Sequence, residues 1–262
     1  MRLFQVDAFT DRPFTGNPAG VCLLDGPKDD AWLQAVAAEM NLSETAFLLR
    51  EGAGYNLRWF TPTTEVNLCG HATLASAHTL WEIAEVAPGQ EIRFHSPRSG
   101  PLGARQEGKH IVLDFPALAE EETTVLPEMT RALGIAPLYI GAVGAIHLME
   151  VAAEEIVRSM TPDFQALRAL PGRGVMVTSI ASTAPFDFVS RYFAPWIGID
   201  EDPVTGSAHC ALGPYWGRKL GKQEMKAYQA SRRGGVLHVR LAGPRVHLGG
   251  MAVTVFAAEL QG

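Results

Sequence analysis

The sequence contains no long apolar run and few cysteines. No stretch approaches the roughly 18 uninterrupted apolar residues that a membrane-spanning helix needs. The opening residues 1–7 alternate as a strand does, which is not typical of a signal peptide. Cys22, Cys69 and Cys210 are odd in number and lack a paired framework, which is typical of reduced thiols. We therefore expect a soluble protein of the cytoplasm.

The sequence also lacks the common cofactor and metal motifs. Neither GxGxxG nor GxxxxGK[ST] occurs, which disfavours nucleotide cofactors, and the hydrolase pattern GxSxG is missing. There is no CxxC, and the histidines have no recognisable metal-ligand spacing. The net charge of −6 disfavours nucleic acid or an anionic membrane as partner. We expect no cofactor and no metal, and a small anionic metabolite as ligand.

The sequence does contain a repeated motif, which we call the module. Residues 58–62 read Arg-Trp-Phe-Thr-Pro and lead to Gly70-His71-Ala72; residues 191–195 read Arg-Tyr-Phe-Ala-Pro and lead to Gly206-Ser207-Ala208. Each copy predicts an aromatic strand, a loop bounded by proline, and a helix of small residues that begins at glycine. Two positive helix ends facing one cleft are suited to holding a small anion. We favour duplication over coincidence.

The hydrophobic pattern predicts an α+β (α/β) fold with two similar domains. Each is expected to be a curved, mostly antiparallel sheet wrapped around a central helix, because the regular strand–helix alternation of a doubly wound sheet is missing. The central helices are predicted near 70–84 and 205–220. We place the domains at 1–116 and 117–251, with the terminal strand 252–262 as a candidate to complete the first.

Glu44 is the first candidate for chemistry. It follows a predicted helix that ends near Asn41, in a polar connector that leads into the strand 46–49. Connectors often carry functional side chains because the flanking elements hold them still. A single carboxylate can be a general acid or base where burial tunes it. The alternative is a solvated carboxylate or a local hydrogen bond in the loop.

Three further candidates lie at the predicted helix starts. His71 and Ser207 each follow the module glycine, so both are expected in a first helical turn beside amides that lack helical partners. An imidazole or a hydroxyl there can hydrogen-bond a carboxylate or a developing enolate. Asp202 precedes Pro203, which is also a common turn or helix-start signal. For His71 and Ser207 the alternative role is helix capping.

Cys69 supports a rival interpretation. A cysteine at a helix start can act as a base or nucleophile. Cofactor-free racemases, however, need two facing bases, and the matching residue of the second module is Thr205. Cys69 is therefore expected to be a small buried residue rather than half of a thiol pair.

Six segments together resemble the PhzF family, named for an isomerase of phenazine biosynthesis, within the diaminopimelate epimerase-like superfamily. The matching segments are Gln5-Val6-Asp7-Ala8-Phe9, Gly16-Asn17-Pro18-Ala19-Gly20-Val21, Asn41-Leu42-Ser43-Glu44-Thr45-Ala46-Phe47, Arg58-Trp59-Phe60-Thr61-Pro62, Glu65-Val66-Asn67-Leu68-Cys69-Gly70-His71-Ala72-Thr73 and Asp202-Pro203-Val204-Thr205-Gly206-Ser207-Ala208-His209. One departure is Met251, where arginine or another polar residue is expected in many members.

The resemblance implies two domains of similar fold with the active site between them, and a cofactor-free, metal-free isomerase, usually a homodimer. It implies that Glu44 is the acid/base residue and that His71, Asp202 and Ser207 line the site. The amides of Gly70 and Gly206 are implied at the two helix ends. In the phenazine enzyme the substrate is trans-2,3-dihydro-3-hydroxyanthranilate, and the glutamate moves a proton along one face of its ring.

From these observations we expect an isomerase of a small metabolite that carries a carboxylate, with Glu44, His71 and Asp202 as catalytic residues and Gly70, Gly206 and Ser207 binding substrate. Two alternatives remain open: a racemase or epimerase that uses Cys69, and a small-molecule-binding protein that has lost turnover. Neither the substrate nor the pathway follows from the sequence.

Overall fold

A computed structural model describes residues 1–182 and 184–261. The chain forms two compact units, one of Met1–Asp114 with Leu248–Gly262 and one of Phe115–His247. Within the described residues, no helix has both the length and the apolar character to cross a membrane.

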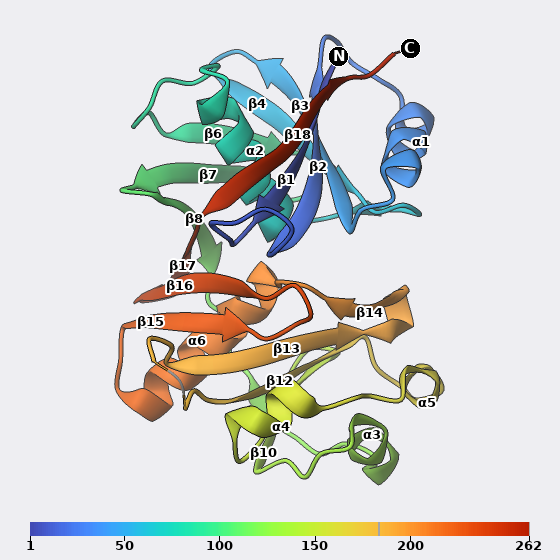
Figure 1. The fold of residues 1–262 in the computed structure, drawn as a ribbon, viewed down its shortest axis with the longest axis vertical. Helices are drawn as coiled ribbons and strands as arrows, with labels where there is room; N and C mark the ends of the chain where they lie inside the picture. Colours follow the sequence, from blue (N-terminus) through green and yellow to red (C-terminus); the bar gives the residue numbers. More distant parts are fainter. Residues whose placement is uncertain (183, 262) are drawn as a thin grey trace. The chain divides into compact units, whose positions relative to one another are not determined.

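The first unit holds two helices and most of its strands come before residue 114 (Figure 1). Its elements are β1 (Arg2–Ala8), β2 (Asn17–Leu24), α1 (Asp30–Met40), β3 (Glu44–Glu51), β4 (Gly54–Phe60), β5 (Glu65–Val66), α2 (Gly70–Glu82), β6 (Ile92–Ser96), β7 (Gly100–Glu107), β8 (His110–Pro116) and β18 (Ala252–Glu259).

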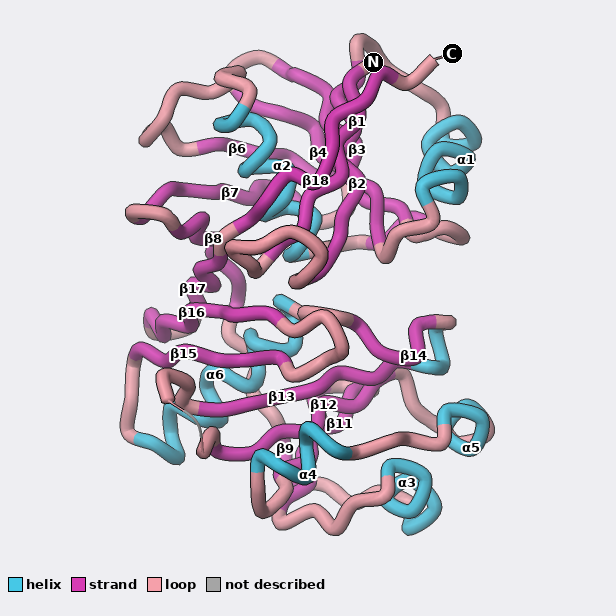
Figure 2. The backbone as a smooth tube through the Cα atoms, viewed as in Figure 1, coloured by secondary structure: helices cyan, strands magenta, loops and turns pink. Residues whose placement is uncertain are grey.

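The sheet of the first unit is mixed but mostly antiparallel. β18, β1 and β2 pair antiparallel in that order, and β3 joins β2 in parallel. β3 pairs antiparallel with β4, which also pairs with the short β5. β6 then adds to β4 in parallel, and the antiparallel strands β7 and β8 follow. β18 therefore lies beside the first strand of the chain (Figure 2).

Helix α2 is the central helix of this unit. It packs against β1, β2, β3 and β18, and 10 of its 13 residues are buried. Its small side chains, such as Ala72, Ala75 and Ser76, let the sheet approach closely. α1 instead buries three residues on one face, Leu33, Val36 and Ala37, and begins after the Asp29 carboxylate, which accepts a hydrogen bond from the Trp32 amide.

The second unit contains the remaining helices and strands. Its elements are β9 (Glu121–Glu122), α3 (Pro127–Leu133), β10 (Tyr139–Val143), β11 (Ile146–Glu150), α4 (Glu154–Ser159), α5 (Phe164–Arg168), β12 (Gly174–Ile180), β13 (Phe188–Ala194), η1 (Pro195–Ile197), β14 (Ile199–Asp202), α6 (Gly206–Leu220), β15 (Glu224–Gln229), β16 (Gly235–Ala242) and β17 (Arg245–Gly250), which ends in the first unit.

The second unit repeats the topology of the first. β10 and β11 are antiparallel, β11 and β12 parallel, and β12 and β13 antiparallel. β13 pairs with the short β14, and after helix α6 the next strand, β15, adds to β13 in parallel. This is the order of β1 to β6, with α6 in the place of α2. The predicted fold class, two similar sheets each with a central helix, is confirmed.

Two details differ from the sequence prediction. Glu44 is the first residue of β3 rather than part of the preceding connector. The strand β15 was not predicted, because its buried positions are Met225, Ala227 and Gln229, of which Met225 alone is a large apolar side chain.

Candidate active site

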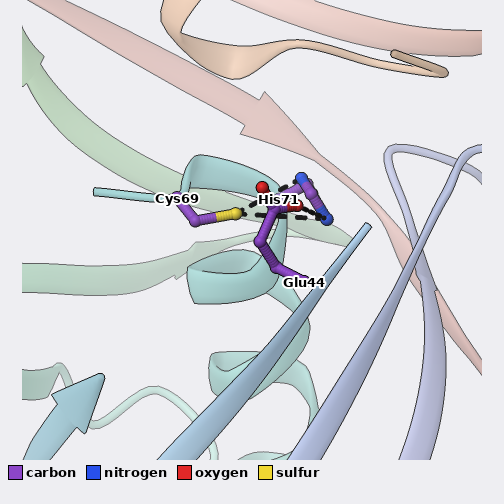
Figure 3. A group of neighbouring side chains, drawn as sticks. All are labelled: Glu44, Cys69 and His71. Carbon is purple, nitrogen blue, oxygen red and sulfur yellow. Dashed lines mark hydrogen bonds and ion pairs between the residues drawn. The ribbon is translucent and has the colours of Figure 1, made fainter. Parts of the chain in front are cut away.

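In the first unit, a strand start and a helix start bring Glu44 and His71 together. Glu44 opens β3, where it is the register partner of Ala19 in β2. His71 is the second residue of α2. The His71 Nε2 lies 3.3 Å from Oε2 of Glu44, and Figure 3 shows the two side chains turned toward each other. The structure thus joins two of the residues that the sequence predicts for the site.

Asn17 fixes the hydrogen-bonding state of His71. Its Nδ2 lies 3.2 Å from the Nδ1 of His71, and its Oδ1 accepts from the Ser43 hydroxyl at 3.4 Å. An amide nitrogen can only donate, so Nδ1 of the imidazole is the acceptor. In the neutral ring the proton is then on Nε2, which donates to the Glu44 carboxylate.

Burial keeps the imidazole neutral. His71 is 4% exposed, and desolvation by burial lowers its pKa to about 3. The Glu44 side chain keeps 14% of its surface exposed, so the carboxylate can reach solvent on one side. A carboxylate at hydrogen-bond distance from a neutral N–H donor is positioned to accept a proton and return it.

Backbone restraints explain why Asn17 is held in place. Gly16 has φ +68°, and a Cβ there would lie 2.2 Å from the Ala8 carbonyl oxygen. The chain can therefore make this close turn only with glycine. Asn17 follows directly and is fully buried at the start of β2. Asn17 and Ser43 were not among the predicted site residues, and the available signal was the turn-forming segment that contains Asn17.

The start of α2 is built to receive negative charge. Cys69 is the N-cap residue, with extended backbone (φ −139°, ψ 110°), and its side chain makes no capping hydrogen bond. The first-turn amides, including that of Gly70, have no partners within the helix, and the helix dipole is positive here. The capping role that was the alternative for His71 is not observed, because the N-cap position belongs to Cys69.

An ion pair anchors the loop that precedes this helix. The Arg58 guanidinium in β4 donates from Nε to Glu65 Oε1 at 2.7 Å and from Nη2 to Oε2 at 3.0 Å. Arg98 approaches the same carboxylate at 2.7 Å. These contacts lower the pKa of Glu65, with the Arg58 hydrogen bond as the largest cause. The anchored turn from β4 through β5 therefore restrains the orientation of Cys69 and His71, which follow it.

The remaining predicted residues lie together in the second unit. Asp202 ends β14, and its Oδ2 accepts from the Thr205 hydroxyl at 2.5 Å. The Gln229 side chain ties the turn, since it donates to the Asp202 carbonyl at 2.7 Å and accepts from the Thr205 amide at 2.8 Å. Gly206 opens α6, and Ser207 is exposed in its first turn.

One group in the described residues has the composition of a metal site. Ligand atoms of Glu44, Cys69 and His71 all lie within 4.8 Å of one another. The Cys69 Sγ is 3.5 Å from Nδ1 and 4.0 Å from Nε2 of His71. The sequence contains no motif that predicts this group, because Glu44 is distant in the chain from the other two.

Comparison with known proteins identifies the family. The profile of the PhzC-PhzF family, described as "Phenazine biosynthesis-like protein", matches residues 6–258. The chain belongs to the PhzC-PhzF family. An uncharacterised isomerase of Halalkalibacterium halodurans is 52% identical over 98% of this chain and 97% of that protein. The predicted family resemblance is confirmed.

Solved PhzC-PhzF structures share the fold. The crystal structure of a PhzF family protein from Enterococcus faecalis superimposes with a TM-score of 0.94 at 44% identity, covering 99% of this chain and 98% of that one. A predicted epimerase from Pseudomonas aeruginosa has a TM-score of 0.75 at 23% identity, over 99% of this chain and 98% of that one, and shares the fold. The chain is therefore a member of an isomerase family with the epimerase-like fold.

Proposed function

We propose that this chain is a cofactor-independent isomerase that moves a proton between two carbons of a small carboxylate-bearing metabolite. The observation that supports this most is the 3.3 Å contact between the Glu44 carboxylate and the Nε2 of a buried, neutral His71. This contact fixes the orientation of Glu44, the proposed base, and its hydrogen-bond partner His71 carries no charge.

In this mechanism Glu44 is both base and acid. Its carboxylate takes a proton from one carbon of the substrate, the double bond shifts, and the resulting carboxylic acid returns the proton to another carbon. The His71 N–H holds one carboxylate oxygen throughout, and Asn17 holds His71. Proton transfer by a positioned side chain contributes typically about 10²–10⁴-fold to the rate.

Negative charge on the substrate is proposed to bind at helix starts. The amide of Gly70, at the positive end of α2, is the candidate donor nearest in sequence to His71. Asp202, Gly206 and Ser207 remain predicted contributors, with Ser207 and the Gly206 amide binding the anion and Asp202 orienting the substrate. Dihydro-hydroxyanthranilate-type compounds, such as trans-2,3-dihydro-3-hydroxyanthranilate, are the first substrates to test.

The test is proton exchange in deuterated water. The purified chain is incubated with a metabolite extract and with the dihydro compound, and mass spectrometry finds which compound gains deuterium or changes isomer. Glu44→Gln should lower the rate about 10²–10⁴-fold with the fold intact. Glu51→Gln is the matched control, because it makes the same change at the exposed end of the same strand. Comparable rates in the two variants contradict the proposal.

A one-carbon racemase that uses Cys69 is the second candidate, favoured by the 3.5 Å contact between its Sγ and the His71 Nδ1. Such an enzyme exchanges deuterium at a stereocentre. That exchange would be lost in Cys69→Ser and kept in Glu44→Gln, the reverse of the proposed pattern. Tight binding of an anion with no exchange in any compound would indicate a binding protein instead.

A further inference from the structure

Three side chains of different chemistry meet at the start of α2: a thiol, an imidazole and a carboxylate. Cys69 is 6% exposed, His71 is 4% exposed, and the Glu44 side chain is 14% exposed. Figure 3 shows them turned toward a common point, Glu44 from β3 and the other two from the helix start. Acidic clusters on protein surfaces are common without an ion, but this set is largely buried and of mixed type.

One of the separations within this group is close to that of a tetrahedral zinc site, and the others are longer. Zinc binds sulfur at about 2.3 Å and nitrogen or oxygen at about 2.0–2.2 Å, so tetrahedral ligand atoms stand about 3.4–3.6 Å apart. The Nε2 of His71 is 3.3 Å from Glu44 Oε2 and 4.0 Å from Cys69 Sγ. The Cys69 Sγ lies nearer Nδ1, at 3.5 Å, so binding through Nε2 requires the thiol to rotate away from Nδ1 to bring the three ligands around one ion.

We propose that Glu44, Cys69 and His71 form a three-ligand site for Zn²⁺, with the fourth position open to water. Thiolate, imidazole and carboxylate are the protein ligands that zinc prefers, and three of them with an open position is a common zinc arrangement. Zinc binding at this site does not require that the chain be an enzyme, and the ion takes no part in the proposed reaction. Its consequence rests on the proposed function: an ion on the Glu44 carboxylate would occupy the base and inhibit the isomerase reversibly.

Asn17 supplies the outer partner that such a site needs. A histidine that binds zinc through Nε2 carries its proton on Nδ1 and donates it to a neighbouring acceptor. The Asn17 amide already faces Nδ1 at 3.2 Å. Exchange of its amide oxygen and nitrogen would present the carbonyl oxygen to that proton. The Ser43 hydroxyl beside it can accept as well as donate, so it can bond the amide in either orientation.

The positive end of α2 opposes a cation at this position. The helix-end effect is worth up to about 2 kcal/mol at partly buried sites, which is about 30-fold in affinity. Two of the three ligands bind as anions, and loss of even an outer partner typically costs about 10–100-fold in metal affinity. The ligand set therefore outweighs the helix end.

Cobalt(II) titration of the full chain tests the site without a known substrate. Co²⁺ replaces zinc in such sites, and a Co–thiolate bond gives a charge-transfer absorption that other ligands do not. We expect this band in the wild type and its loss in Cys69→Ser, together with at least about 100-fold weaker Zn²⁺ binding by calorimetry. Cys22→Ser and Cys210→Ser are matched controls, since both thiols are buried elsewhere, and they should keep the band.

Further measurements distinguish binding at this site from incidental metal binding, and distinguish failure of the zinc site from failure of the proposed activity. Glu44→Gln should keep the thiolate band but bind Zn²⁺ about 10–100-fold more weakly, and Mg²⁺ should not compete, because it prefers six oxygen ligands. Circular dichroism checks that each variant folds. A wild type without the band, or a band that survives in folded Cys69→Ser, overturns the site. Absence of proton exchange alone would overturn only the isomerase.

Discussion

The two units of the chain share a scaffold and differ in the chemistry that it carries. Arg191 in β13 makes the same two-pronged pair with Glu201, at 2.7 and 2.9 Å, that Arg58 makes with Glu65 in the first unit. Both central helices begin after an N-cap residue, Cys69 or Thr205, with extended backbone and no side-chain cap. The arginine–glutamate pair and the extended N-cap residue before the central helix are therefore the same in both units.

The side chains around the two helix starts are not preserved. Thr45 pairs with Phe60 in the first unit, and Val175 pairs with Phe193 in the second, so Gly174 occupies the position of Glu44. A Cβ at Gly174 would lie 2.4 Å from the Tyr192 hydroxyl oxygen. A phenol thus fills the space in which the first unit holds a carboxylate.

Burial and the nearby Asp202 raise the pKa of Tyr192 to about 12, so this phenol stays protonated at neutral pH. With Gly174 for Glu44 and Ser207 for His71, the second unit has no equivalent of the carboxylate–imidazole pair. The scaffold is therefore repeated and the reactive groups are not, and the first unit is where proton transfer is expected.

The largest difference between the units should be in activity. His71→Asn removes the N–H that holds the Glu44 carboxylate, whereas Ser207→Ala removes an exposed hydroxyl at the equivalent module position. We expect deuterium exchange to fall about 10²–10³-fold in the first variant and about tenfold or less in the second, because water can replace an exposed hydroxyl. Equal effects, or a larger one for Ser207, would contradict the assignment of proton transfer to the first unit.

A second difference should be in stability. Replacing either module arginine by methionine leaves a half-buried carboxylate, but Glu65 keeps Arg98 at 2.7 Å. Arg191 also donates to the Val157 carbonyl at 3.3 Å and to the Met160 carbonyl at 2.7 Å. Its removal therefore leaves more polar groups without a partner.

We expect Arg191→Met to lower the free energy of unfolding by about 3 kcal/mol and Arg58→Met by about 1–2 kcal/mol. Urea unfolding followed by circular dichroism measures both. If Arg58→Met is the more damaging of the two, the Arg98 contact does not compensate Glu65 as proposed.

Much of the scaffold could be predicted because its signals are local. Asp29 before the first helix, the glycines at 70 and 206, and the aromatic-proline segments each act within a few residues of the chain. The repeated order of these signals also predicted the two similar units. The strand β15 was missed because Gln229, one of its buried residues, is polar. Its burial depends on its hydrogen bond to the turn before α6, not on hydrophobicity.

The details of the site could not be predicted because they depend on contacts between distant segments. Asn17 meets His71 across 54 positions, and Ser43 meets Asn17 across 26. The sequence names Glu44 and His71 as candidates through their places in a connector and at a helix start, and the family resemblance implies the same two residues. The sequence does not show which imidazole nitrogen of His71 is protonated, nor that the Cys69 thiol lies close to both Glu44 and His71.

The smallest expected contrast concerns the residues one turn into each central helix. Thr73 donates its hydroxyl to the Cys69 carbonyl at 2.6 Å, and His209 at the equivalent position donates Nδ1–H to the Thr205 carbonyl at 2.8 Å. Among the described residues, no hydrogen-bond partner exists for the buried Nε2 of His209. Desolvation lowers the pKa of His209 to about 4, partly offset by the Thr205 hydrogen bond.

This depressed pKa should make the protein less stable in mild acid. The unfolded chain binds a proton on this ring below its ordinary pKa of 6.5, whereas the folded chain does so only below about 4. Stability is therefore lost as the pH falls from 6.5 to 4, by at most about 3 kcal/mol, and this loss levels off below pH 4. His209→Thr copies the first unit, keeps a donor for the carbonyl and removes the titration.

Urea unfolding of the wild type, His209→Thr and His209→Asn at a series of pH values between 7 and 4 tests this contrast. Both variants should be less stable at pH 7 because they leave a cavity beside Phe188, on which the imidazole stacks. Both should also lose less stability on acidification than the wild type. Some slope should remain, because the pKa of His71 is lowered to about 3 as well. An unchanged slope in both variants would mean that the ring at position 209 already takes up its proton in the folded chain.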